Sequence, residues 1–325
     1  MRKILISLLW IALAMCACPI SATAQTTTAP VTIQPVGPDI TDFQLGQQAF
    51  EQKKYQQALV YYEKAAAAGN TEAMVIIGNF YYQGEGVIQD YHQAMAWYQK
   101  AAARSNAVAM LCIGRLYSTG QGVPQDYKQA LEWLKKAEEA GNSDAMSDIG
   151  DIYNMGLGVT QDYKQALNWY SKAAALGNAT AMTNIGTFYA WGLGVNQDYK
   201  KALNWFKKAA ALGDSNAMGT VGLCYEHGLG VSEDDQIAFI WYQKAALLGN
   251  RYAENDLGTL YLLGRGTQQD YSKAIYWLEQ AASQGDIKAC KNMAFIYTNG
   301  LGVAADQQKA QYWADRAKKL QSNGN

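Results

Sequence analysis

Hydrophobic and polar positions along this chain alternate with helical periodicity, in blocks of 36 residues. In one block, residues 142–177, the first half places small or apolar residues on one helical stripe, namely Ala145, Met146, Ile149, Gly150 and Tyr153. The second half has a matching stripe of Ala166, Trp169, Tyr170, Ala173 and Ala174. Between them lies Gly156-Leu157-Gly158-Val159, where two glycines permit positive φ and end a helix. Each block therefore predicts two helices joined by a turn.

Residues that favour helix ends stand at the expected places in the same block. Gly141 suits the left-handed residue that ends the preceding helix, and Asn142 or Ser143 can cap the next one. Asp162 can cap the second helix of the block.

The block occurs seven times at constant phase. The clearest column holds a tryptophan in every copy: Trp97, Trp133, Trp169, Trp205, Trp241, Trp277 and Trp313. A glycine column, which includes Gly150, recurs inside the first helix, where glycine is costly by about 1 kcal/mol relative to alanine. Such a column predicts close helix crossings, with small residues facing large ones. We expect the seven tryptophans to be the large partners and to form the structural core.

The chain divides into five segments. Residues 1–24 are typical of an export signal, with a basic start, an apolar stretch of 14 residues that is too short to span a bilayer, and a small-x-small cleavage site. We expect a flexible leader at 25–41, a hairpin with a short tetratricopeptide-like turn at 42–70, seven repeats at 71–320 and a tail at 321–325. A periplasmic or secreted location follows, with no membrane insertion of the mature chain. Cys16 and Cys18 leave lipid anchoring through either cysteine as an alternative.

The unit A-x-x-x-(I/L)-G-x-x-Y-x-x-G-x-G-V-x-x-D-x-x-x-A-x-x-W-(Y/L/F)-x-K-A-A-x-x-G resembles the Sel-1-like repeat family, a relative of the tetratricopeptide repeats. The resemblance covers residues 71–317 closely and about 43–70 loosely. It implies an all-α fold, a right-handed α-α superhelical solenoid of tandem helix-turn-helix repeats. It also implies an adaptor that binds proteins through a concave groove, with exported bacterial members linked to envelope processes, signalling and host interaction.

Three columns of the first helices change chemistry in every copy while the scaffold columns stay fixed. Since first helices usually line the concave face of such solenoids, these columns are candidates for a tailored groove. The residues that we predict to contribute to a protein- or peptide-binding groove are Arg115, Asp151, Asn184, Trp191, Leu223 and His227. Neutral drift on a solvated face is the alternative for each, and Trp191 could instead pack on the adjoining turn.

Composition argues against several other functions. The net charge of −1 gives no basic field for nucleic acid. With only His92 and His227, four repeats apart, no histidine-based triad or two-histidine metal site is expected within one chain. We therefore predict no enzyme activity, catalytic residue, metal or cofactor. Cys112, Cys224 and Cys290 lie in different repeats and are expected to be small buried hydrophobes. A periplasmic accessory that binds peptidoglycan, the cell-wall glycan, or regulates a cell-wall hydrolase is the alternative function.

Overall fold

A computed structural model describes residues 41–322, and all regular structure in this range is helical. The helices in chain order are α2 (Asp42–Glu51), α3 (Tyr55–Ala67), α4 (Thr71–Gln83), α5 (Tyr91–Ala102), α6 (Ala107–Thr119), α7 (Tyr127–Glu139), α8 (Ser143–Met155), α9 (Tyr163–Ala175), α10 (Ala179–Trp191), α11 (Tyr199–Ala211), α12 (Ser215–Glu226), α13 (Asp235–Leu247), α14 (Arg251–Leu263), α15 (Tyr271–Ser283), α16 (Ile287–Asn299) and α17 (Gln307–Ser322). The predicted export signal at 1–24, the leader up to residue 40 and residues 323–325 lie outside the described range.

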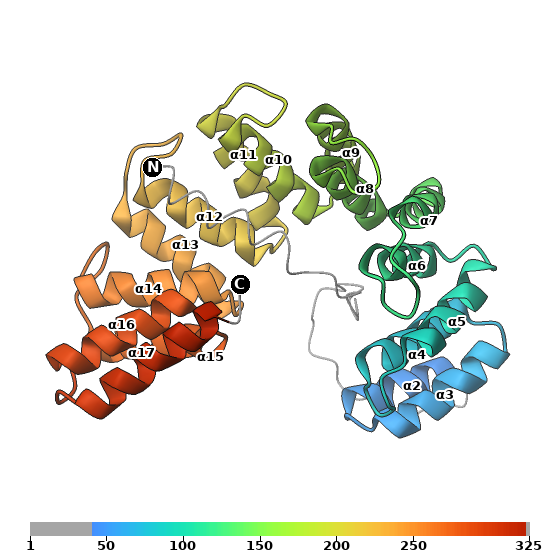
Figure 1. Cartoon of the computed structure of the whole chain (residues 1–325), viewed down its shortest axis with the longest axis horizontal. Coiled ribbons are helices and arrows are strands. Elements are labelled where there is room, and N and C mark those ends of the chain that lie inside the picture. The colour runs from blue at the N-terminus through green and yellow to red at the C-terminus, as the bar shows by residue number, and fades with distance from the viewer. Residues whose placement is uncertain (1–40, 323–325) are drawn as a thin grey trace. The chain divides into compact units, whose positions relative to one another are not determined.

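The helices belong to two compact units, one ending at Asp162 and the other beginning at Tyr163. The first unit contains α2–α8 and the second contains α9–α17. Within each unit every helix packs against the next one along the chain, so helix pairs stack in sequence order (Figure 1). The predicted all-α solenoid of helix pairs is confirmed. In the described range no helix has the combination of length and apolar character that crossing a bilayer requires.

The residues at the helix ends explain why each hairpin forms where it does. The Asn142 side chain accepts a hydrogen bond from the Ala145 amide at 2.8 Å, so Asn142 is the N-cap of α8, one of the two predicted candidates. Gly156 ends this helix in the left-handed conformation with φ of 70°. Asp126 stands one repeat before Asp162, the residue predicted to cap a second helix. The Asp126 carboxylate caps α7, while the Asp126 amide donates to the Tyr117 carbonyl at 2.9 Å. One aspartate thus starts the second helix and closes the turn onto the first.

The residue after the tryptophan belongs to the core in six of the seven repeats. All seven periodic tryptophans are only half-buried, and lysine ammonium groups lie 3.7 to 4.7 Å from the ring centroids of five of them. In six repeats the following residue is buried instead: Tyr98, Leu134, Tyr170, Phe206, Tyr242 and Leu278. The prediction that the tryptophans form the core is therefore wrong in position by one residue. They lie at its edge because neighbouring helical residues point about 100° apart.

The glycine column faces these buried residues. A Cβ atom on Gly186 would lie 2.6 Å from a ring carbon of Phe206, and one on Gly222 would lie 2.8 Å from the ring of Tyr242. The close crossing inferred from the sequence is present, but the large partner is the residue after the tryptophan. Cys112, Cys224 and Cys290 are buried, as expected for small hydrophobes.

The two ends of the repeat array follow the same packing. Thr41 caps α2 with a side chain that accepts from the Gln44 amide, and the hairpin to α3 turns through Lys53, whose φ is 58°. At the other end α17 continues to Ser322, so the first two residues of the predicted tail are helical.

Candidate functional site

The variable columns of the first helices lie where one first helix meets the next. In the first unit, Arg115 of α6 forms a two-point ion pair with Asp148 of α8, with Nε–Oδ2 and Nη2–Oδ1 distances of 2.6 and 3.1 Å. In the second unit, Asn292 of α16 donates to Thr259 of α14 at 3.1 Å. Both contacts join residues 33 apart in the sequence, so the same two columns meet in both units.

The Arg115–Asp148 pair changes the interpretation of Arg115. Only 16% of the Arg115 side chain and 22% of the Asp148 side chain are exposed. Burial raises the pKa of Asp148 above its usual range, and the Arg115 guanidinium opposes that rise. Arg115 therefore ties two repeats together, and its charge is already matched by Asp148 before any partner binds.

The other predicted groove residues are divided between the two units. Asp151 lies half-buried on α8 of the first unit. In the second unit, Asn184 and Leu223 are half-buried on α10 and α12, and His227, which follows α12, is exposed. Asp151 and Asn184 both have contacts within the chain. Their role in binding stays a prediction.

Trp191 packs inward. It is half-buried at the end of α10, against a cluster that includes Leu203, Phe206 and Cys224. Its indole Nε1 is buried and has no hydrogen-bond acceptor among the described residues. Trp191 therefore packs mainly against side chains of α11 and α12, and its role in binding stays a prediction.

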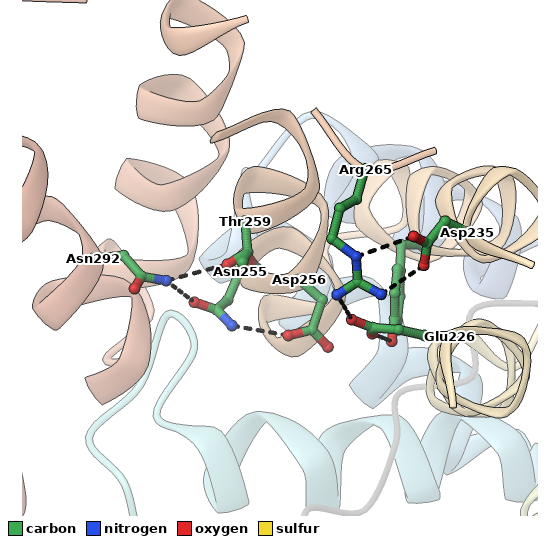
Figure 2. Close-up of polar contacts among 8 residues, drawn as sticks. Glu226, Asp235, Asn255, Asp256, Thr259, Arg265 and Asn292 are labelled. Atoms are coloured by element: carbon green, nitrogen blue, oxygen red, sulfur yellow. Dashed lines mark hydrogen bonds and ion pairs between the residues drawn. The ribbon is translucent and has the colours of Figure 1, made fainter. Parts of the chain in front are cut away.

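A cavity of about 330 Å³, wide open to solvent, lies between α14 and α16 in the second unit. It is lined by Asn255, Asp256, Thr259, Lys288, Lys291 and Asn292. The Asn292 amide donates to Asn255 Oδ1 at 3.2 Å and to Thr259, and Asn255 Nδ2 donates to Asp256 Oδ1 at 2.9 Å (Figure 2). These bonds link the two helices and fix the amide orientations in the cavity wall.

Asp256 is the residue of this cavity whose pKa is shifted most. Its register partner 33 residues earlier is Leu223, which cannot pair with a carboxylate as Arg115 pairs with Asp148. Desolvation and the nearby Glu226 carboxylate raise the pKa of Asp256 to about 7, against the weaker effect of Lys288. Asp256 therefore changes charge close to neutral pH.

A clamp around Arg265 lies beside this cavity. Arg265, in the turn after α14, binds Asp235 with Nη2–Oδ1 and Nε–Oδ2 distances of 2.6 and 3.0 Å, and binds Glu226 at 3.0 Å (Figure 2). The Tyr242 hydroxyl donates to the other Glu226 oxygen at 2.7 Å. The clamp joins the end of α12, the start of α13 and the α14–α15 turn, so it holds the helices next to Asp256 in place.

Comparison with known proteins places the chain in a family. The Sel1 repeat profile matches eight consecutive segments: 43–70, 71–106, 105–142, 143–178, 179–214, 215–250, 251–286 and 287–322. This chain belongs to the Sel1 repeat family. The matched segments include the hairpin at 43–70, for which the sequence indicated a tetratricopeptide-like turn. Sel1 repeat proteins are generally non-enzymatic scaffolds that bind other proteins.

Solved structures of Sel1 repeat proteins resemble this one. A protective antigen of uropathogenic Escherichia coli strains with an SLR fold is 32% identical, with a TM-score of 0.62, over 86% of this chain and 64% of its own. This chain thus spans less than two thirds of that protein. A Sel1 repeat protein from Oxalobacter formigenes is also 32% identical with a TM-score of 0.62, over 75% of this chain and 97% of its own. None of the curated proteins is significantly similar.

Sequence reasoning about this Sel1 repeat protein missed the cavity residues of α14 and α16. Asp256, Thr259 and Asn292 stand in the variable columns, but nothing in those columns marks the last repeats. Lys288 could have been noticed in the sequence, because a lysine in the first turn of a helix is unfavourable for the helix dipole. Residues 41–322 contain no group of three or more metal-binding side chains.

Replacing Asp256 by asparagine should stabilise this Sel1 repeat protein at pH 8 by about 2 kcal/mol. The folded-state pKa lies above the ordinary 3.8, so the folded state holds the proton more tightly. The wild type therefore loses stability as the pH rises from about 4 to 7, whereas Asp256→Asn carries no such penalty. The expected gain of about 2 kcal/mol is half of the free energy that the full pKa shift of Asp256 represents, because Asp256 is partly exposed to solvent.

Urea unfolding of wild type and Asp256→Asn at pH 8 and pH 4 measures this difference. The gain should shrink towards zero at pH 4, where wild-type Asp256 is protonated. Asp315→Asn, in an exposed ion pair with Lys318, is the matched control and should show little change at either pH. An equal gain for Asp256→Asn at both pH values would contradict the assigned titration.

Proposed function

We propose that this protein is an exported scaffold that binds a protein partner through the exposed side of the first helices of its second unit. We define this first-helix face by Thr259, Leu263, Lys288, Asn292 and Phe295, on α14 and α16. The observation that carries the proposal is that polar cavity residues and exposed apolar residues occur together there. Leu263 and Phe295 are 56% and 54% exposed, and one turn away lie the cavity residues Thr259 and Asn292.

The composition of the first-helix face supports a protein as the partner. Interfaces combine apolar and aromatic anchors with polar side chains around them. Leu263 and Phe295 stand in columns that hold polar residues in several other repeats, so their exposure is not a requirement of the repeat. A stack of helix pairs presents these side chains at fixed spacing, so little ordering is needed on binding.

The proposal includes the cellular location of the protein. The N-terminal sequence pattern supports export to the periplasm or beyond, with lipid anchoring at Cys18 or Cys16 as the alternative. The likeness to a protective antigen of uropathogenic Escherichia coli supports a role in envelope processes or host interaction. A periplasmic accessory that binds peptidoglycan or regulates a cell-wall hydrolase is the second candidate.

Site-specific photo-crosslinking in the native cells tests the proposal. A photo-reactive amino acid at position 295 or 263 should give a discrete crosslinked protein, identified by mass spectrometry. Ile240, an exposed apolar residue of the second helix α13, is the matched control position and should give none. Position 191 is a poorer choice because Trp191 packs inward.

The outcome separates the two candidates. Absence of a crosslinked protein from both first-helix positions, with the protein present and folded, would contradict the proposed scaffold. Co-sedimentation with purified peptidoglycan under those conditions would favour the cell-wall accessory.

A further inference from the structure

Two lysines line the α14–α16 cavity, and one of them, Lys288, interacts at longer range with the Asp256 and Asp286 carboxylates. Lys288 and Lys291 are exposed, lie one turn apart on α16 and line the cavity. In residues 41–322 neither forms an ion pair, although other lysines of the second unit, such as Lys201 and Lys273, pair with the aspartates that cap their helices. Two exposed ammonium groups one turn apart, neither of them in an ion pair, attract an anion.

The repeat pattern gives no structural reason for these lysines. The residue at the Lys288 position is Glu72, Asp144 and Asn216 in other copies, which suit the start of a helix. The residue at the Lys291 position is Val75, Leu111 and Ser147, all buried. The repeat therefore does not require either lysine, and Lys288 opposes the helix dipole in the first turn of α16.

The rest of the cavity suits a short peptide. Asn255, Thr259 and Asn292 offer amide and hydroxyl groups held in place by their mutual hydrogen bonds. Leu263 lies one turn after Thr259 on α14, and Phe295 one turn after Lys291 on α16. An apolar side chain next to a carboxylate would thus meet both kinds of surface.

We propose that the cavity between α14 and α16 binds an acidic peptide segment of the partner protein. An aspartate or glutamate of the peptide lies between Lys288 and Lys291, and a neighbouring apolar residue packs on Leu263 and Phe295. This inference rests on the proposed function and names the chemistry of the partner at that same face.

Asp256 makes the binding depend on pH. Its carboxylate, when ionised, repels an incoming carboxylate, and protonation removes that charge. The charged and titratable groups around Asp256 are Glu226 at the end of α12, Tyr242 on α13, Arg265 in the turn after α14, and Asp286 and Lys288 at the start of α16. Glu226 is already paired with Arg265 and Tyr242, so Asp256 is the carboxylate of the cavity that is free to respond.

Selection from a random heptapeptide phage library on the immobilised full chain at pH 6 tests the proposal. Enriched sequences should contain aspartate or glutamate beside a large apolar residue. A fluorescein-labelled copy of the most enriched peptide should bind about three- to tenfold more tightly at pH 6 than at pH 8. Asp256→Asn should bind it equally at both pH values.

Two variants separate the parts of the proposal. Lys288→Gln/Lys291→Gln should lose at least tenfold in affinity for the acidic peptide, and its thermal unfolding should remain that of a folded protein because both lysines are exposed. The amide analogue of the peptide, with glutamine or asparagine for its acidic residue, should bind wild type as weakly as the acidic peptide binds the double variant. Phe295→Ser should weaken both peptides.

The results that overturn this inference are distinct from those that overturn the proposed function. Enriched peptides without an acidic residue, or acidic peptides that bind the lysine double variant as well as wild type, exclude acidic recognition. The scaffold proposal would stand in that case if position 295 still crosslinks to a protein in cells. Failure to enrich any sequence also rules out the cavity as a peptide site.

Discussion

Replacing Gly186 by alanine should destabilise the second unit by about 2–3 kcal/mol, although alanine is the better helix former. The added Cβ would lie 2.6 Å from a ring carbon of Phe206. That ring is buried, so it has no free space to move into, and α10 and α11 would have to separate. The overlap outweighs the gain in helix propensity of about 1 kcal/mol. Urea unfolding followed by circular dichroism measures the change.

Gly219 provides the matched control. It also lies inside a first helix, α12, but the nearest atom to an added Cβ is the Ala253 Cβ at 3.8 Å, an ordinary contact distance. Gly219→Ala should therefore stabilise the protein by up to about 1 kcal/mol. If the two substitutions shift the unfolding midpoint in the same direction, the glycine column is not explained by close packing.

Truncation of Phe206 should cost much more than truncation of the neighbouring tryptophan. Phe206→Ala removes a buried ring from the core, for which we expect a loss of about 3–5 kcal/mol. Trp205 is half-buried, and the Lys208 ammonium lies 4.1 Å from its ring centroid, so Trp205→Ala should cost about half as much.

The same unfolding experiment on both variants checks this order. A larger loss for Trp205→Ala would show that the tryptophan, and not the residue after it, carries the core. The double variant Gly186→Ala/Phe206→Ala gives a further check, because removing the ring removes the overlap. Its loss should be smaller than the sum of the two single losses.

The contacts between first helices show why variable columns are hard to interpret from sequence. The same two columns contain the Arg115–Asp148 pair, which ties repeats together, and the Thr259–Asn292 contact, which lines a cavity. They also contain Phe295, which is exposed. Variation in these columns therefore reflects repeat-to-repeat contacts as well as exposed surface, and only the exposed members are candidates for partner binding.

The helix pairs were predictable because each depends on nearby residues. Asn142 and Gly156 begin and end α8 through hydrogen bonds within its own turns, and their equivalents do the same in other repeats. A 36-residue period then predicts that identical hairpins stack, since none can bury its apolar side alone. The fold class and the hairpins of the described range follow from the sequence for these reasons.

The core partner and the cavity were decided by tertiary packing. Trp205 and Phe206 are both large and apolar, so the sequence cannot tell which one faces Gly186; the crossing of α10 and α11 selects Phe206. Likewise the altered pKa of Asp256 arises from burial and from Glu226, 30 residues away in the chain, and the cavity forms only where α14 and α16 meet. Local chemistry determines where helices start and stop, whereas the environment of a side chain depends on which distant residues the packing brings beside it.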